Sequence, residues 1–180
     1  MTYDDVTLEK GGIHYLCGDI NDETARVTVE WILRNELIDE PFAELKLLIN
    51  SCGGSLTDAF ALIDIMKGAT AKISTIGVGE VSSAGLAIFM AGEKGARILT
   101  PNTAILSHQY SWGTYGKEHE LVAAKRGFDL TTNMMMSHYK KCTGLTEKKI
   151  REFLLPASDV WLSAKDALDL GICDEIKRAY

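Results

Sequence analysis

The chain has 180 residues, of which 46% are hydrophobic and 24% charged, so we expect a soluble globular protein with a sizeable core. Its formal net charge of −6, without a basic stripe, argues against general binding to nucleic acid. The longest apolar stretch, Leu86–Ala91, is far short of the roughly 18 residues that a membrane span needs. The four cysteines form no CxxC pair, which favours free thiols in a reducing, cytoplasmic compartment.

The first half of the chain alternates between patterns typical of strands and of helices. We expect a strand at 12–17, a helix at 23–35, a buried strand at 45–49 and a helix at 57–67. Ser51–Gly54 lies between the second strand and the second helix, and its glycine pair predicts a turn there.

The second half continues the alternation and adds one long helix. We expect strands at 72–78, 97–99 and 103–108, and helices at 84–91, about 118–141, 146–155 and 164–171. Strands that alternate with helices predict an α/β fold with right-handed crossovers. The length, and the lack of a linker-like tract in the sequence, predict a single domain over residues 1–180.

The stretch Gly79–Ala87 is the most informative part of the chain, because it carries two serines where a strand pattern passes into a helix pattern. Backbone N–H groups at a helix N-terminus are unpaired, and they can hold a developing oxyanion while a serine attacks a carbonyl. Serine is also a preferred helix cap, and taken alone a serine here is more often a cap than a nucleophile. Ser82 fits the cap position, which leaves Ser83 as the candidate nucleophile.

Two further residues fit the needs of a serine nucleophile, which requires a base and a group that orients the base. His108 ends an apolar strand pattern, and Asp159 stands just before a capped helix. Considered singly, each has an ordinary alternative, as a surface histidine and as a turn aspartate. The segment Ser51–Gly54 can bring backbone amides close to a ligand or be a plain tight turn. It is not a phosphate-binding loop, since no Gly-Lys-Ser/Thr follows it at the required spacing.

Together these segments resemble, in order and approximate spacing, those of the ClpP family, the proteolytic subunits of the Clp protease. The matching segments are Ile49-Asn-Ser-Cys-Gly-Gly54, Gly79-Glu-Val-Ser-Ser-Ala-Gly85, Ala91-Gly-Glu-Lys-Gly-Ala-Arg97, Leu106-Ser-His-Gln109, Asp159-Val-Trp-Leu-Ser-Ala164 and Gly171-Ile-Cys-Asp174. The family patterns that they resemble are Ile-Asn-Ser-Pro-Gly-Gly, Gly-Gln-Ala-Ala-Ser-Met-Gly, Ala-Gly-Ala-Lys-Gly-Lys-Arg, Met-Ile-His-Gln, Asp-Arg-Phe-Leu-Ser-Ala and Gly-Leu-Val-Asp. The resemblance covers nearly the whole chain from about Gly12 onward.

The resemblance implies a serine endopeptidase and gives each candidate residue a role. The nucleophile of the family falls on Ser83, its base on His108 and its orienting acid on Asp159. Its oxyanion donors fall on the backbone N–H groups of Gly54 and Ala84. The resemblance implies no metal and no organic cofactor. ATP would be used by a separate unfoldase, since this chain has no Walker motif.

The resemblance also implies a ClpP/crotonase-like fold of repeated β-β-α units. A handle region at about residues 110–141, made of the long helix and a strand-like segment before it, would join two stacked heptameric rings around a closed chamber. Unfolded proteins and peptides would be cleaved inside that chamber. The expected partner is an AAA+ unfoldase, the Clp ATPase. The family's longer N-terminal segment, which forms axial loops that touch the unfoldase, is expected to be largely missing here, so the sequence leaves unfoldase docking open.

The sequence departs from the family pattern at two positions near the expected site. Cys52 replaces a proline in the glycine segment, and Tyr110 replaces a proline shortly after His108. Three other functions stay open: a non-proteolytic structural subunit of a mixed Clp ring, a crotonase-type acyl-CoA enzyme, and a Ser–Lys peptidase. The intact set of triad residues disfavours the first two, and a Ser–Lys mechanism does not explain His108.

Overall fold

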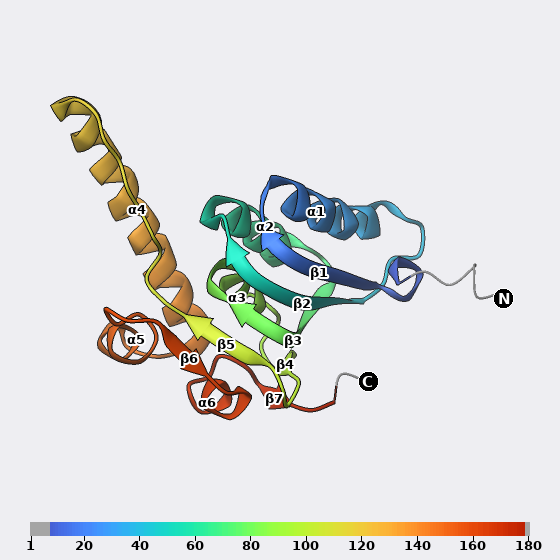
Figure 1. The fold of residues 1–180 in the computed structure, drawn as a ribbon. Coiled ribbons are helices and arrows are strands. Elements are labelled where there is room, and N and C mark those ends of the chain that lie inside the picture. The colour runs from blue at the N-terminus through green and yellow to red at the C-terminus, as the bar shows by residue number, and fades with distance from the viewer. Residues whose placement is uncertain (1–7, 179–180) are drawn as a thin grey trace.

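The computed structural model describes residues 8–178, and one mixed sheet with helices packed against it organises the chain (Figure 1). The main path of the sheet runs β1 (Ile13–Ile20), β2 (Glu44–Gly54), β3 (Lys72–Ser82), β4 (Arg97–Leu99) and β7 (Glu175–Ile176), and each neighbouring pair is parallel. A branch adds β5 (Ala104–Ser107) parallel to β3, and β6 (Val160–Leu162) antiparallel to β5. The α/β fold class expected from the sequence is therefore confirmed.

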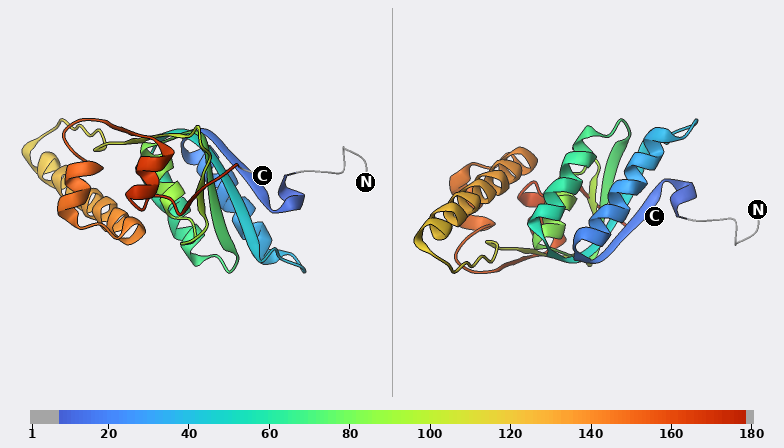
Figure 2. Two further views of the ribbon diagram at one scale, coloured as in Figure 1. Left: turned by 90° about the horizontal axis from the view of Figure 1, so that it is seen from below. Right: turned by 90° about the horizontal axis from the view of Figure 1, so that it is seen from above.

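Helices connect the strands, and α1 and α2 lie side by side over one face of the sheet (Figure 2). The helices are α1 (Asp22–Leu37), α2 (Leu56–Gly68), α3 (Ser83–Met90), α4 (Glu118–Thr143), α5 (Glu147–Phe153) and α6 (Ala164–Asp169), and a 3-10 turn at Glu9–Gly11 precedes β1. Side chains cap several of them: Asn21 accepts from the first turn of α1, and Ser55 and Thr146 cap α2 and α5. The capping box expected at the start of α6, between Ser163 and Asp166, is confirmed.

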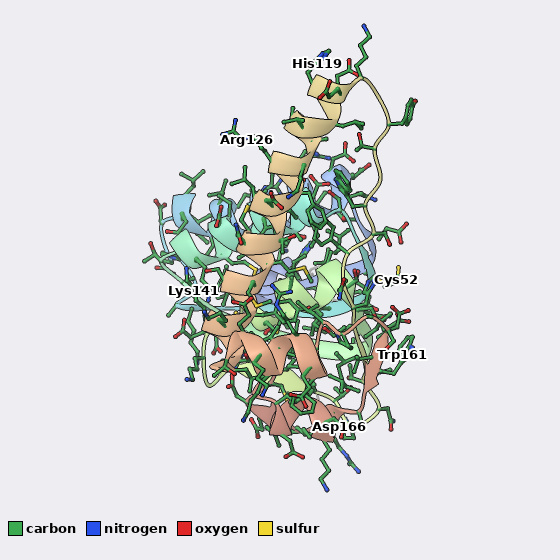
Figure 3. All side chains as sticks on the ribbon, turned by 90° about the vertical axis from the view of Figure 1, so that its left-hand side faces the viewer. Cys52, His119, Arg126, Lys141, Trp161 and Asp166 are labelled. Carbon is green, nitrogen blue, oxygen red and sulfur yellow. The ribbon has the colours of Figure 1, made fainter. Side chains whose placement is uncertain are left out.

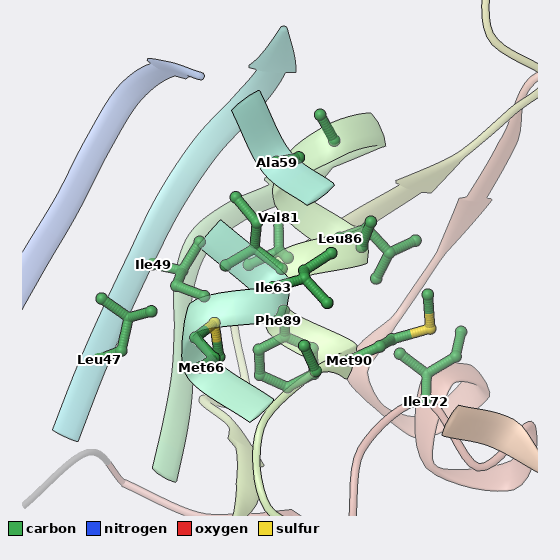
Figure 4. Close-up of a cluster of buried hydrophobic side chains, with 14 of the residues drawn as sticks. Leu47, Ile49, Ala59, Ile63, Met66, Val81, Leu86, Phe89, Met90 and Ile172 are labelled. Carbon is green, nitrogen blue, oxygen red and sulfur yellow. The ribbon is translucent and has the colours of Figure 1, made fainter. Parts of the chain in front are cut away.

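The core lies where α2 and α3 meet β2 and β3 (Figure 4). Every residue of α3 after its first is buried, as expected for a short helix that is apolar on all sides. Val81 and Leu86 pack there with Ile49 and Ile63, and all four are nearly inaccessible. The strand-to-helix junction between β3 and α3 therefore rests on a close-packed core.

The strand β3 pairs with two neighbours in turn, and this positions the junction. Its part Thr75–Gly77 pairs with β4, whereas its part Glu80–Ser82 pairs with β5. Between the two parts the ladder with β2 shifts its register, and Asn50 Oδ1 accepts a hydrogen bond from the backbone N–H of Glu80 at 3.1 Å. Since β3 and β5 end side by side, the residues that follow them come close in space.

The long helix α4 leaves the body of the molecule, as Figure 1 shows, and Figure 3 follows it from His119 at its outer end to Lys141 beside the body. Its buried side chains, Met135, Met136, His138 and Tyr139, all lie in its last third. The long helix expected at about 118–141 is confirmed. Within the single chain, residues 109–117 before it form no strand, and the Tyr110 hydroxyl donates to the carbonyl of Phe128 in α4. The role of this region as a handle between rings stays a prediction. Within residues 8–178, no helix combines the length and the apolar character that crossing a membrane requires.

The boundaries around the glycine segment also differ from expectation. Ser51–Gly54 is not a free turn but the end of β2, because β1 continues beside it and pairs Ile20 with Gly54. In the same way, β3 continues beyond Val78 to Ser82, since β5 offers it a partner there. Both extensions bring strand ends directly to the candidate site.

Candidate active site

Ser83 begins α3 with a left-handed backbone, at φ +53°. Among the described residues it is the one non-glycine residue with positive φ, a conformation that costs on the order of 1–3 kcal/mol. Ser82 occupies the N-cap position as expected, but its side chain does not cap the helix. Its Oγ donates instead to Glu80 Oε1 at 2.8 Å. Strained backbone conformations of this kind are concentrated at functional sites, so the positive φ favours Ser83 over Ser82 as the functional serine.

His108 contacts the Ser83 hydroxyl directly. The β3–β5 ladder pairs Ser82 with Leu106, so the chain emerges from β5 next to the start of α3. His108 Nε2 lies 2.8 Å from Ser83 Oγ, a distance typical of a hydrogen bond between imidazole and hydroxyl. A histidine in this position can accept the hydroxyl proton.

Asp159 lies beside His108 but beyond hydrogen-bond range. The antiparallel β5–β6 ladder pairs Ser107 with Val160, so the next position sets His108 opposite Asp159. The distance from His108 Nδ1 to Asp159 Oδ1 is 3.8 Å, within reach of an ion pair but too long for a hydrogen bond. The Asp159 side chain is 65% exposed, and that of His108 is 24% exposed. The structure thus brings the three sequence-predicted residues together. His108 is within hydrogen-bond distance of Ser83 but not of Asp159.

The glycine end of β2 packs against Ser83. A Cβ added to Gly53 would lie 2.6 Å from Ser83 Cβ and 3.1 Å from the backbone nitrogen of Ala84, which leaves no room for a side chain. Ser51 fixes this segment from the buried side: its Oγ donates to the carbonyl of Gly18 at 2.6 Å and accepts from the N–H of Gly53 at 3.1 Å. The backbone of the glycine segment therefore lies next to the N-terminus of α3.

The two expected oxyanion donors lie on the two sides of this contact. Ala84 follows Ser83 in α3 and is buried. Gly54 ends β2 opposite Ile20, where an added Cβ would lie 2.2 Å from the Ile20 carbonyl oxygen. Their role as donors stays a prediction. Gly53 makes the closest approach to Ser83, a role not expected from the sequence, although the consecutive glycines were the signal for it.

A family model described as Clp protease matches residues 3–179. The chain belongs to the Clp protease family. This is a family of peptidases, and its members generally form oligomeric rings that work with Clp ATPases. The mixed α/β fold with its mostly parallel sheet is consistent with the fold of the family.

One departure from the Clp protease pattern ties the segment after His108 to α4. The hydroxyl of Tyr110 donates to the carbonyl of Phe128 at 3.0 Å, and its ring lies 5.6 Å from the Phe128 ring. The ring of Trp112 lies 5.1 Å from Phe128 on the same helix. These aromatic contacts hold the segment along α4 without any strand pairing.

The other departure places a thiol close to the site. Cys52 Sγ donates to Asp19 Oδ1 at 3.1 Å, and this hydrogen bond, together with some desolvation and the negative charge of Asp19, raises the pKa of the exposed Cys52 thiol. A raised pKa lowers the thiolate fraction, so Cys52 is not an activated nucleophile. All four cysteines are free thiols, as expected, and burial raises the pKa of Cys173 to about 11.

A cavity of about 690 Å³ opens between α2 and α4, and none of the triad candidates lines it. His138 faces this cavity and donates from Nε2 to the carbonyl of Ala87 at 2.8 Å. Burial lowers the pKa of His138, which favours a neutral imidazole with a structural role. In the described part of the chain, no group of three or more His, Cys, Asp or Glu side chains is arranged to hold a metal ion.

Proposed function

We propose that this protein is a serine endopeptidase, the proteolytic subunit of an ATP-dependent Clp protease, which cleaves unfolded proteins and peptides by acyl transfer. The observation that carries the proposal is the 2.8 Å contact between His108 Nε2 and Ser83 Oγ. A serine hydroxyl bonded to imidazole at a helix N-terminus has a base for its proton and backbone donors for an oxyanion. Membership of the Clp protease family supports the same chemistry.

In the acylation step, Ser83 Oγ attacks the scissile carbonyl while His108 Nε2 takes the hydroxyl proton. The backbone N–H groups of Gly54 and Ala84 donate hydrogen bonds to the oxyanion of the tetrahedral intermediate. His108 then gives its proton to the leaving amine, and the acyl group stays on Ser83 as an ester. Water, deprotonated by His108, hydrolyses the ester and restores the serine.

Asp159 has the orienting role in this mechanism. A carboxylate that accepts a hydrogen bond from His108 Nδ1 fixes the tautomer in which Nε2 is free to accept a proton. Asp159 has to close from 3.8 Å to hydrogen-bond distance for this. Catalytic hydrogen bonds are often long in a free enzyme and tighten in its complex with substrate.

Assembly into two stacked heptameric rings around a chamber is part of the proposal. It is supported by apolar side chains that the single chain leaves exposed on the projecting helix α4, namely Leu121, Val122, Leu130 and Met134. Apolar groups gathered on an element that leaves the body favour a surface for a partner. We further propose a cytoplasmic location, and an AAA+ unfoldase that supplies unfolded chains to the chamber.

The Ser83→Ala variant tests the proposal, with hydrolysis of a short fluorogenic peptide as the measurement. We expect activity to fall by about 10³-fold or more, because the nucleophile is lost. Ser82→Ala is the matched control, and it should stay within about threefold of wild type because its hydroxyl bonds to Glu80. A fluorophosphonate should label the wild type and the control but not Ser83→Ala. Undiminished hydrolysis by Ser83→Ala would overturn the proposal.

The same experiments separate the remaining alternatives. A non-proteolytic subunit of a mixed ring would leave Ser83 unlabelled by the fluorophosphonate even in an assembly whose size is verified by light scattering. A crotonase-type enzyme would bind acyl-CoA, which a titration with acetyl-CoA measures directly. Labelling of Ser83 without acyl-CoA binding would leave a serine peptidase, and a Ser–Lys mechanism does not explain the contact between His108 and Ser83.

A further inference from the structure

The two residues that flank His108 both reach the segment that leads to Asp159. The hydrogen bonds run from Ser107 Oγ to the carbonyl of Leu154 (2.6 Å), from Gln109 Nε2 to the carbonyl of Leu155 (3.0 Å) and from Gln109 Nε2 to the carbonyl of Pro156 (3.0 Å). An amide group has two N–H donors, so Gln109 commits both of them to this segment. Three consecutive carbonyl groups are therefore held by the immediate neighbours of the proposed base.

The carboxylate of Asp159 depends on this backbone for its position. Within the described residues it makes no hydrogen bond, and its one charged contact is the 3.8 Å approach to His108. The β5–β6 ladder holds the chain just after it, where Val160 pairs with Ser107. The bonds from Gln109 hold the chain just before it. A shift of the short span between these two anchors moves Asp159 relative to His108.

Ser107 and Gln109 differ in how deeply they are embedded. Ser107 is buried and also contacts the hydroxyl of Tyr139 at 3.2 Å, so its replacement would disturb the core. Gln109 is exposed, and replacing it should leave the fold intact. Gln109 can therefore be tested without unfolding the protein.

We infer that Gln109 is a positioning residue, which sets the distance between Asp159 and His108 through the carbonyls of Leu155 and Pro156. The inference rests on the proposed function, because it concerns the orientation of the proposed base. Gln109 itself touches none of the reacting groups. Its effect should appear in the rate of the chemical step and not in the binding of the peptide.

The test replaces Gln109 by methionine, which keeps the length of the side chain and removes both donors. In the full-length, assembled protein we expect kcat for a fluorogenic peptide to fall about tenfold, with KM nearly unchanged, because the base is less well oriented. Gln109→Glu should lower kcat at least as far, since its carboxylate faces two carbonyl oxygens. An unchanged kcat, or an increase in KM alone, contradicts the inference.

Thr146→Ala is the matched control for a loss of stability in the same region. Thr146 Oγ1 accepts from the N–H of Lys149 and caps α5, the helix that leads into the segment held by Gln109. The variant removes this cap and leaves the carbonyl bonds in place. We expect its melting temperature to fall at least as much as that of Gln109→Met, with kcat unchanged. Equal losses of kcat in the two variants would contradict the inference and show that Gln109 only stabilises this region.

A double-mutant cycle tests the route through Asp159. If Gln109 acts through that carboxylate, Gln109→Met should have no further effect on the fluorophosphonate labelling rate once Asp159→Asn is present. A further tenfold loss in that background contradicts the route. The two proposals fail in different ways. A normal kcat in Gln109→Met while Ser83→Ala is inactive contradicts only the role of Gln109. Activity in Ser83→Ala contradicts the proposed function itself.

Discussion

The serine end and the acid end of the candidate site are built in different ways. Ser83 lies on a junction that packs onto the core, with a left-handed backbone and with Gly53 pressed against it. Asp159 is 65% exposed and depends on a short span of chain. His108, between them, is 2.8 Å from the first and 3.8 Å from the second. Core packing therefore fixes the position of Ser83, whereas a few polar contacts fix the position of Asp159.

The largest effect should come from closing the space at the serine end with Gly53→Ala. The new Cβ would clash with Ser83 at 2.6 Å, so we expect peptide hydrolysis to fall about a thousandfold, equivalent to ~4 kcal/mol. Gly18→Ala is the control: its φ of +84° gives a similar backbone cost, and no atom lies within 4 Å of the added Cβ. An active Gly53→Ala variant would show that the serine end tolerates movement and is no more firmly held than the acid end.

A second test concerns the ion pair between Arg97 and Asp174, which ties β4 to the segment just before β7. Arg97 in β4 is 3% exposed; it contacts Asp174 at 2.6 Å and donates to the carbonyl of Cys142 near the end of α4 at 2.9 Å. Asp174→Asn leaves this buried guanidinium without its counter-charge. We expect a loss of about 3 kcal/mol in the free energy of unfolding, measured with urea at pH 7. The exposed pair of Glu147 with Arg151 is the control, and Glu147→Gln should cost less than about 1 kcal/mol.

The pH dependence of that difference follows from the pKa of Asp174. Burial alone would raise this pKa, but hydrogen bonds from Arg97 and from the N–H of Gly95 outweigh it, so the pKa lies below its ordinary value of 3.8. The carboxylate therefore contributes stability above its unfolded pKa, about 3.9, and loses it as the pH falls through the lowered value. The stability gap between the wild type and Asp174→Asn should shrink below about pH 4. A gap that stays constant down to pH 2 would contradict this assignment.

The smallest of these effects should come from Asp159→Asn at the acid end. We expect hydrolysis to fall about a hundredfold, less than for a fully buried triad aspartate, because the carboxylate is exposed and not hydrogen-bonded to His108. The free energy of unfolding should not change. Asp169→Asn, on the exposed end of α6, is the control and should leave both quantities unchanged. A loss as large as that of Ser83→Ala would mean that the acid end is as firmly set as the serine end.

The elements with strong local signals were predicted well, and those that depend on a neighbouring strand were not. The periodic helix at 118–141 and the capping box at Ser163 are both present. Ser51–Gly54 was expected as a turn because its residue types favour turns, but pairing with β1 extends β2 through it. The strand-like segment that the family resemblance implies before α4 pairs with no strand within the described residues, and Tyr110 and Trp112 there contact Phe128 of α4.

By itself, the sequence determined the α/β class, the family resemblance and the three residues of the proposed triad, since residue types in a fixed order carry that information. Only the tertiary structure decided that Ser83 is strained, that Gly53 touches it, and that His108 contacts one partner and not the other. These features depend on the register between β3, β5 and β6, segments that lie far apart in the chain. Local patterns do not encode that register, because it is set by packing against a shared core.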